Sequence, residues 1–417
     1  MPPRNNLKRP VMMLPRGAVF ARTLAAAYAL VAYQTAYFKA HHPAAFMAAN
    51  LSLVMDDTDK VRSFRDDAIA QGLKVLPPDI NASNYRFEPV DAASIRYGLG
   101  GVKGTGAAAI DAIVAARKAG GPFRDLFDFC RRIDKRVANR RVIEALIRAG
   151  AFDSIVDHRS SLMASVGIAL EAAEQAERNA LQAGLFDLGG APEQALQLVA
   201  TPPWSERERL LNEKQALGFF LSGHPYNEIR AELSAFIRRP LASLEPQKEP
   251  LLLAGIVTAT RTQMTRRGKM IVVTLDDGTA QVEMTVFNEL YEAERAKIRE
   301  DEPLIVEGKV SRDDFSGGLR INADRLLTLA EARGRFAKAL RLALNGKVGL
   351  ADTATEKLRL LLAPYRNGPC PVRVRYRNTQ AECELPLGES WRVRLDDDLL
   401  SGLQQWLEAE NVEVVYQ

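Results

Sequence analysis

The chain has 417 residues, of which 47% are hydrophobic and 26% are charged, and its formal net charge is only +4. These values are ordinary for a soluble globular protein, and the length predicts about two to four domains. Because the net charge is small, any attraction to nucleic acid has to come from local patches. The three cysteines are isolated, so they indicate neither a disulfide framework nor a zinc site and fit a reducing cytosol.

Residues 1–20 carry prolines and arginines without periodicity, and we expect this segment to be disordered. Residues 21–73 predict two or three helices that end near Gly72. The LPPD sequence at 76–79 then breaks regular structure, because paired prolines cannot continue a helix or a strand interior.

The run over 25–49 is apolar, but Gln34 and Lys39 interrupt it. A membrane span needs about 20 mostly apolar residues without charge, so we predict a buried helix here and no membrane association. The basic residues near the N-terminus precede no continuous apolar run with a small-residue cleavage site, which argues against a secretory signal. We therefore expect a cytoplasmic protein.

A glycine-rich segment, GLGGVKGTG at 98–106, opens a helix expected over 107–118. A glycine turn at a helix N-terminus exposes backbone N–H groups at the positive end of the helix dipole, which suits a phosphate. The spacing is wrong for a dinucleotide fingerprint and no parallel βαβ unit surrounds it. The pattern instead predicts a helix-hairpin-helix, which grips DNA backbone without reading sequence, and a related unit is expected over 142–152.

Twelve basic side chains and only five acidic ones lie between residues 96 and 148, a local net charge of +7. This excess favours a salt-sensitive phosphate-binding face. The alternative is an ordinary helical hairpin closed by a glycine turn, with solvated arginines. The residues that we assign to DNA binding in this region are Lys103, Gly104, Thr105, Gly106, Arg140 and Arg141.

A helix is expected over 160–182, and it leads into the sequence QAGLFD at 182–187. An extended peptide of this kind can place Leu185 and Phe186 in a pocket while Gln182 makes a polar contact, which is the usual division of labour in peptide recognition. Alternatively, such a Leu-Phe pair makes only a peripheral packing contact with a hydrophobic core. The segments 184–203 and 240–250 are linkers, and they flank a helix expected over 205–221.

From residue 251 the hydrophobic period changes to two, in short runs over 251–260, 269–276, 280–287, 303–311 and 319–328. A helical piece over 288–299 lies between the third run and the fourth. Five strands with a helix after the third is the order of an OB-type barrel. The fold class that we predict is therefore a multidomain α+β chain.

The first loop of the expected barrel is basic, and aromatic residues lie on or beside its strands (Phe287 and Phe315). OB folds use such loops with an aromatic-bearing face to hold single strands. The alternative is that these phenylalanines belong to the core. The basic residues that we assign to single-strand binding are Arg261, Arg266, Arg267 and Lys269.

The remaining segment, from 331, mixes two helical stretches with strands expected over 370–376, 382–387 and 391–395, as in a small α/β domain. The acidic cluster at 56–59 resembles a metal site, but no phosphate-cradling element adjoins it, and a solvated helix junction is the preferred interpretation. We find no complete active site, so we assign no catalytic residue, no metal ligand and no cofactor to this chain.

Several of these motifs together resemble the C-terminal part of the catalytic alpha subunits of bacterial DNA polymerase III, which are C-family replicative polymerases. The resemblance runs from about residue 25 to the end of the chain. The stretches that carry it are 26–37 with 43–47, 76–79, 97–106, 139–153 and 217–225.

The resemblance implies a domain order and a set of partners. Residues 21–90 correspond to the end of the fingers region, 91–155 to tandem helix-hairpin-helix units, 156–249 to a helical region with linkers, 250–330 to the OB domain and 331–417 to a C-terminal partner-binding domain. Gln182, Leu185 and Phe186 then form the internal motif that binds the sliding clamp. DNA and the tau subunit of the clamp loader are the other implied partners.

Two departures from the family pattern shape the expected function. The family's catalytic palm, where Mg²⁺ supports nucleotidyl transfer, precedes this region, and residues 1–19 match nothing in the family. A truncated or frame-disrupted reading frame would explain both. We expect a DNA-binding and clamp-binding portion that is inactive alone, with two alternatives: one half of a split polymerase that acts with a separate catalytic piece, or an inert truncated product.

Overall fold

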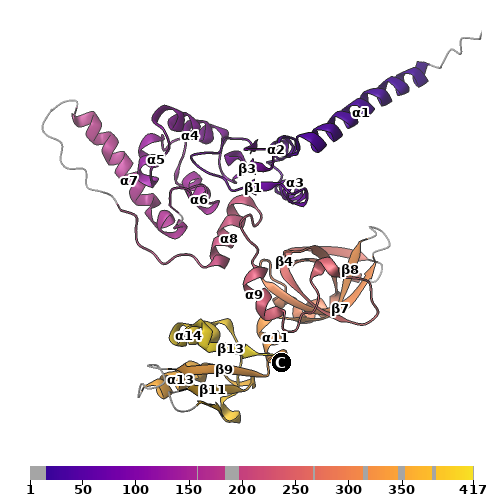
Figure 1. Cartoon of the computed structure of the whole chain (residues 1–417), viewed down its shortest axis with the longest axis vertical. Helices are drawn as coiled ribbons and strands as arrows, with labels where there is room; N and C mark the ends of the chain where they lie inside the picture. Colours follow the sequence, from indigo (N-terminus) through magenta and orange to yellow (C-terminus); the bar gives the residue numbers. More distant parts are fainter. Residues whose placement is uncertain are drawn as a thin grey trace, which may run out of the picture. The chain divides into compact units, whose positions relative to one another are not determined.

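The computed structural model describes residues 16–156, 158–183, 197–265, 268–312, 318–345, 353–377 and 382–416. Side chains are described for all of these except 16–24, 180–183, 265, 268, 345 and 377. The chain forms two compact units, Met1–Ser222 and Gly223–Gln417 (Figure 1). The elements confirm the predicted α+β class.

Unit 1 begins with three helices, α1 (Arg16–His41), α2 (Pro43–Leu53) and α3 (Thr58–Ala70). Residues 16–20, expected to lack regular structure, are therefore helical. The carboxylate of Asp57 caps α3 by accepting a hydrogen bond from the backbone N–H of Lys60, which satisfies one of the free amides of the first helical turn.

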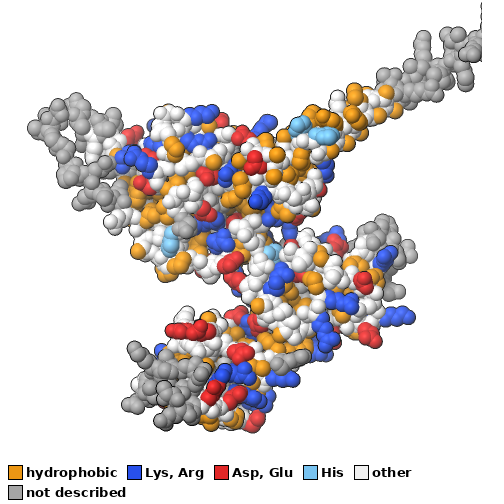
Figure 2. All heavy atoms as spheres, viewed as in Figure 1, with side chains coloured by type: hydrophobic (Ala, Val, Ile, Leu, Met, Phe, Trp, Pro, Cys, Tyr) orange, Lys and Arg blue, Asp and Glu red, His pale blue; other side chains and the backbone are white. Residues whose placement is uncertain are grey.

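The prediction of a buried helix over 25–49 is wrong for its first part. Every side chain from Ala25 to His41 is exposed, including Tyr28 and Tyr33, which are 68% and 67% exposed. Figure 2 shows hydrophobic side chains along the part of this helix that is coloured by residue type. Only α2 is buried as expected, through Met47 and Leu51. The segment is apolar, as the sequence indicates, but burial depends on what packs against the helix. Few of the described residues pack against this part of α1.

The rest of unit 1 is a helical module around a small sheet of order β1-β3-β2 (Figure 1). The core contains large side chains that are almost fully buried, including Tyr97, Phe129 and Phe152. The elements, in chain order, are β1 (Lys74–Leu76), β2 (Glu88–Pro89), β3 (Ser94–Arg96), η1 (Leu99–Gly101), α4 (Ala107–Gly120), α5 (Leu126–Arg132), α6 (Arg140–Arg148), α7 (Arg159–Ala183) and α8 (Glu206–Leu217).

Unit 2 contains a closed barrel of order β4-β5-β6-β8-β7, which confirms the OB-type prediction. β6 and β8 pair in parallel and the other neighbours are antiparallel. The inward side chains are aliphatic, as the period of two requires. Its elements are α9 (Tyr226–Leu233), η2 (Leu241–Ser243), β4 (Leu251–Thr265), β5 (Gly268–Asp276), β6 (Gln281–Phe287), α10 (Asn288–Glu294), η3 (Arg295–Lys297), β7 (Pro303–Arg312) and β8 (Leu319–Leu327).

A second sheet of order β12-β11-β9-β13 follows, and the helices α13 and α14 pack on it (Figure 1). Its elements are α11 (Leu329–Phe336), β9 (Ala339–Asn345), α13 (Ala354–Leu362), η4 (Ala363–Tyr365), β10 (Arg366–Cys370), β11 (Val372–Arg377), β12 (Glu382–Pro386), η5 (Glu389–Trp391), α14 (Asp397–Leu407), η6 (Ala409–Asn411) and β13 (Val412–Val415).

The strand expected over 391–395 is wrong. Residues 389–391 form the short helix η5, and only Val393 makes isolated bridges, with Arg366 and Cys370. The strand expected over 370–376 is interrupted at Pro371, which has no N–H for a ladder. Among the helices of the described residues, none is long and apolar enough to cross a membrane.

Candidate nucleic-acid interface

The first hairpin lies between η1 and α4, and its turn is closed by its own groups. The hydroxyl of Thr105 donates to the carbonyl oxygens of Leu99 and Val102, at 2.9 and 2.7 Å. Leu99 and Val102 are both buried, at 0% and 1% exposure, and anchor the turn in the core of unit 1. Gly104 has φ +83°, a conformation that favours glycine. The Thr105 hydroxyl therefore holds the turn, and the assignment of Thr105 to DNA binding stays a prediction.

The backbone before the hairpin leaves no room for side chains. A Cβ on Gly98 would lie 2.5 Å from the carbonyl carbon of Arg86 and 2.6 Å from the carbonyl oxygen of Tyr85. By contrast, a Cβ on Gly104 or Gly106 would meet nothing within 4 Å. Gly98 is thus required by packing, whereas Gly104 and Gly106 face open space.

The N-terminus of α4 is open. Gly106 is its N-cap residue and supplies no side-chain hydrogen bond. The first amides of a helix have no partner inside the helix, and they lie at the positive end of its dipole. The hairpin therefore presents backbone donors beside two glycines, which is an arrangement suited to a phosphate.

Lys103 is exposed, but it also contacts α8. Its backbone N–H donates to the carbonyl of Ala216 at 2.7 Å. A Cβ built on Gly218, the C-cap residue of α8, would come within 2.6 Å of the Lys103 ammonium. The positive charge lies at the negative end of that helix, which is favourable. The sequence did not indicate this structural contact.

The second hairpin follows α6, with Gly150 at φ +81°. Behind it lies Arg159, whose side chain is 5% exposed and pairs with Asp153 at 2.5 Å and with Glu213 at 3.7 Å. Arg159 also donates to the carbonyl of Arg148 at 3.2 Å. A Cβ on Gly150 would lie 2.2 Å from the Arg159 guanidinium. This buried ion network supports the turn, and no pattern in the sequence indicates it.

Arg140 and Arg141 lie in the first turn of α6, at the opposite end of that helix from Gly150. A nine-residue helix is about 13 Å long. The side chain of Arg140 is 65% exposed and pairs with Glu144 at 2.8 Å. Asn139 caps the helix by accepting hydrogen bonds from the amides of Arg141 and Val142. These arginines thus lie about one helix length from the second hairpin.

Several of the twelve basic residues in this region hold the fold rather than a ligand. Arg117 donates to the carbonyls of Ile80 and Ser83. Arg132 donates to the carbonyls of Ala116 and Gly121 and pairs with Asp128. The local charge of +7 therefore overstates the charge that remains for a phosphate.

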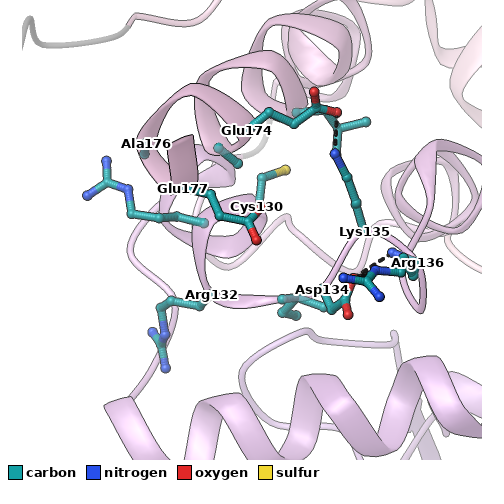
Figure 3. A pocket seen from close by; sticks show the side chains of 12 residues that line it. Cys130, Arg132, Asp134, Lys135, Arg136, Glu174, Ala176 and Glu177 are labelled. Atoms are coloured by element: carbon teal, nitrogen blue, oxygen red, sulfur yellow. Dashed lines mark hydrogen bonds and ion pairs between the residues drawn. The ribbon is translucent and has the colours of Figure 1, made fainter. Parts of the chain in front are cut away.

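A pocket of about 470 Å³ opens between α7 and the connection from α5 to α6 (Figure 3). Lys135 pairs with Glu174 at 2.7 Å and Arg136 with Asp134 at 3.6 Å, so the charges around the pocket largely neutralise one another. Cys130 lines it, and burial raises the pKa of this thiol to about 12, which keeps it protonated and unreactive at neutral pH. We assign no ligand to this pocket.

Of the predicted barrel residues that the structure describes, Arg261 lies on the part of β4 that pairs with β5, and Lys269 lies on β5 itself. Arg261 makes two 2.7 Å contacts with Glu283, so its charge is matched. The ammonium of Lys269 lies 5.3 Å from the ring centre of Tyr291. Phe287 is 48% exposed at the end of β6. An exposed aromatic ring can stack a base, but Arg261 is less available than the sequence suggested.

Other predicted site residues cannot be placed. Arg266, Arg267, Phe315, Leu185 and Phe186 lie outside the described residues. Gln182 belongs to the last turn of α7, and its side chain is not described. Within the described ranges, no group of His, Cys, Asp or Glu side chains could hold a metal ion.

Three protein families match the chain. A helix-hairpin-helix motif family matches residues 72–162, and an OB-fold nucleic acid binding domain matches residues 251–329. A family described as the C-terminal domain of DNA polymerase III subunit alpha matches residues 357–407. These matches fall on the hairpin module of unit 1, the barrel and the C-terminal sheet.

The chain is also similar to whole DNA polymerase III alpha subunits. It is 43% identical over 403 residues to the subunit of Neisseria meningitidis serogroup A, and 41% identical over 408 residues to that of Escherichia coli strain K12. The alignments cover 95% and 96% of this chain but 35% of each relative. The chain thus spans about a third of the length of the curated relatives that it matches.

Proposed function

This chain corresponds to the C-terminal part of the alpha subunit of bacterial DNA polymerase III, and on that premise we propose that it holds DNA and the sliding clamp during replication in the bacterial cytoplasm. The observation that carries the proposal is the first hairpin, with the open N-terminus of α4 beside Gly104 and Gly106. Backbone donors of this kind bind phosphates without reading the base sequence.

Duplex backbone is the ligand that we propose for unit 1. Helix N-terminal amides contact phosphate oxygens, and the exposed Arg140 and Arg141 add charge at a second point of the module. The barrel of unit 2 is proposed to take the single-stranded template, with Phe287 as a stacking surface and Lys269 on the neighbouring strand β5.

The clamp and the clamp loader are the protein partners of the proposal. Gln182, Leu185 and Phe186 would bind the sliding clamp, and the C-terminal sheet domain would contact the tau subunit. Replacing Leu185 and Phe186 with alanine should abolish clamp binding and leave DNA affinity intact. Clamp binding that survives this double substitution would contradict the motif assignment.

A salt titration tests the DNA part. The observed binding constant of the chain for a primed duplex should fall linearly with salt concentration on a log–log plot, with a slope set by the number of phosphates contacted. Arg140→Glu with Arg141→Glu should weaken binding and flatten this slope. Arg178→Glu with Arg207→Glu, which changes the charge of unit 1 equally, is the matched control. An equal effect of both pairs would mean that only overall charge matters.

A second function is favoured by one observation, the exposed apolar surface of α1. Side chains such as Leu30, Tyr33 and Phe38 are 57%, 67% and 51% exposed. A helix that is apolar on most of its circumference is normally enclosed by protein. A separate catalytic piece with its own Mg²⁺ site would enclose α1, and together the two chains would polymerise nucleotides.

Mixing tests this alternative. The part of the Neisseria meningitidis alpha subunit that the chain does not span should bind the chain, and Leu30→Glu with Tyr33→Glu should remove the binding. Nucleotide incorporation by the mixture, and not by either piece alone, would support a split polymerase. Absence of both binding and incorporation would reject it.

A further inference from the structure

A small pocket lies beside the first strand of the barrel, away from the basic first loop. Its volume is about 290 Å³, and it is lined by Phe236, Arg238, Arg239, Gln247 and residues 250–253. These strand residues belong to the part of β4 that pairs with β7, whereas Arg261 lies on the part that pairs with β5. The pocket is therefore distinct from the barrel surface described above.

The two arginines have no acidic partner there. All residues that line the pocket are described, and none of them is acidic. Among the described residues, neither guanidinium has a hydrogen-bond or ion-pair partner, and both side chains are exposed. Arg261, by contrast, is matched by Glu283. Arg238 and Arg239 thus keep all their donors for a ligand.

The remaining walls are held in place. The backbone N–H of Gln247 donates to the carbonyl of Val310 at 3.0 Å, and its side-chain amide donates to the carbonyl of Glu249 at 3.1 Å. Phe236 stacks on Phe336, with ring centres 4.9 Å apart and planes at 17°. The arginines therefore stand beside a partly apolar wall whose members are held by hydrogen bonds and ring stacking.

We propose that Arg238 and Arg239 form a subsite for a backbone phosphate of the single-stranded DNA that the barrel holds. Planar guanidinium groups donate two parallel hydrogen bonds to phosphate oxygens, and two adjacent arginines offer two such forks. The pocket is at the small end of ligand sites, so it fits a phosphate with its sugar better than a peptide with several side chains. The subsite rests on the proposed DNA-holding function.

Fluorescence anisotropy with the full chain and a labelled oligothymidylate of about fifteen nucleotides tests the subsite. Arg238→Ala with Arg239→Ala should raise the Kd roughly three- to tenfold and reduce the salt slope by about 0.7 for each lost contact. The melting temperature should not change, because both side chains are exposed and unpaired. Arg238→Lys with Arg239→Lys should keep the salt slope but lose part of the affinity. Lysine keeps the positive charge, but it lacks the planar guanidinium group that donates two parallel hydrogen bonds.

Arg295→Ala with Arg299→Ala is the matched control, because it removes two exposed arginines from the same barrel; its Kd should stay near that of the unchanged chain. An unchanged Kd and slope in the Arg238/Arg239 alanine variant would overturn the subsite and leave the proposed function standing. The subsite would also be overturned if the Arg238/Arg239 alanine variant kept its affinity for DNA but lost affinity for a polyglutamate peptide. That result would indicate an acidic protein partner. Failure of the unchanged chain to bind the oligonucleotide would overturn both.

Discussion

Among the residues whose side chains are described, each unit has one buried arginine, and the two arginines differ in what they support. In unit 1, Arg159 pairs with Asp153 and with the buried Glu213, directly behind the hairpin turn at Gly150. In unit 2, Arg333 pairs with Glu232 at 2.7 Å and with Asp397 at 2.5 Å. Arg333 thereby joins α9 to the C-terminal domain instead of supporting a candidate DNA surface.

The difference indicates how stability and binding are coupled in each unit. Glu213 is 1% exposed and accepts hydrogen bonds from the amides of Leu221 and Ser222, so the network of Arg159 also holds the chain after α8. Damage to it should disturb both the fold and the hairpin. Damage to Arg333 should loosen the junction between barrel and sheet, and leave the outer barrel strands able to bind.

Replacing Arg159 is expected to have the largest effect. Arg159→Met leaves Glu213 buried without its counter-charge, which costs about 3–5 kcal/mol of unfolding free energy. Duplex affinity should fall with stability, because the support of the Gly150 turn is lost. Chemical denaturation and duplex anisotropy measure the two effects, and Arg178→Met, on an exposed part of α7, is the control. If the Arg159 variant is destabilised but keeps its full affinity for duplex DNA, the expected coupling between stability and duplex binding is contradicted.

Arg333→Met should cost less, about 2–4 kcal/mol, because Asp397 is 70% exposed and can be solvated. Hydrogen exchange should increase around α9, α11 and α14. The affinity for oligothymidylate should change little once the protein is fully folded. A large fall in that affinity would show that the junction, and not only the barrel, contributes to strand binding.

The two kinds of glycine in the first hairpin should behave differently. Gly98→Ala forces a Cβ against the backbone of residues 85–87 and should cost about 1–3 kcal/mol. Gly106→Ala should change the stability by less than about 0.5 kcal/mol, because nothing lies within 4 Å of the added methyl group. Thermal denaturation of both variants tests this contrast, and equal losses would contradict the described packing.

The smallest effect concerns acid sensitivity in unit 2. Burial by itself raises the pKa of Asp276, but hydrogen bonds from His224, Gln281 and the amide of Gly278 outweigh it and hold the pKa well below its usual range. This carboxylate therefore stabilises the fold above its unfolded pKa of about 4, and the contribution is lost as the pH falls below that value.

Asp276→Asn should lower the unfolding free energy at pH 7 by about 1 kcal/mol and reduce its dependence on pH below about 5. Denaturation curves at several pH values measure this, and Asp324→Asn on the exposed face of β8 is the control. An unchanged acid dependence in the Asp276 variant would mean that another group titrates.

The sequence predicted the elements with a strong local signal. The period of two and the order of five runs predicted the barrel, and the glycines at 98–106 predicted the first hairpin. By contrast, β9 and β13 were missed, because these short strands lie in a segment of mixed pattern and are stabilised by pairing between residues far apart in sequence.

Properties that depend on partners in space could not be read from the sequence. Glu213 lies in a helix with many charged residues, where no pattern in the sequence indicates burial, yet it is buried. Arg261 looked available and is paired, whereas Arg238 and Arg239, to which the sequence assigned no role, have no ion-pair or hydrogen-bond partner among the residues that the structure describes. The sequence therefore predicts the sign of the net charge in each region, but not how much of that charge remains unpaired for a ligand.

The most direct test of the central claim is duplex binding by the unchanged chain and by Gly106→Ala over a range of salt concentrations. We predict that the binding constant of the unchanged chain falls linearly with salt on a log–log plot, and that Gly106→Ala binds several-fold more weakly at the same stability, because the added methyl group obstructs the approach of a phosphate to α4. Equal binding by the two proteins, or binding without salt dependence, would contradict the claim that this hairpin holds DNA.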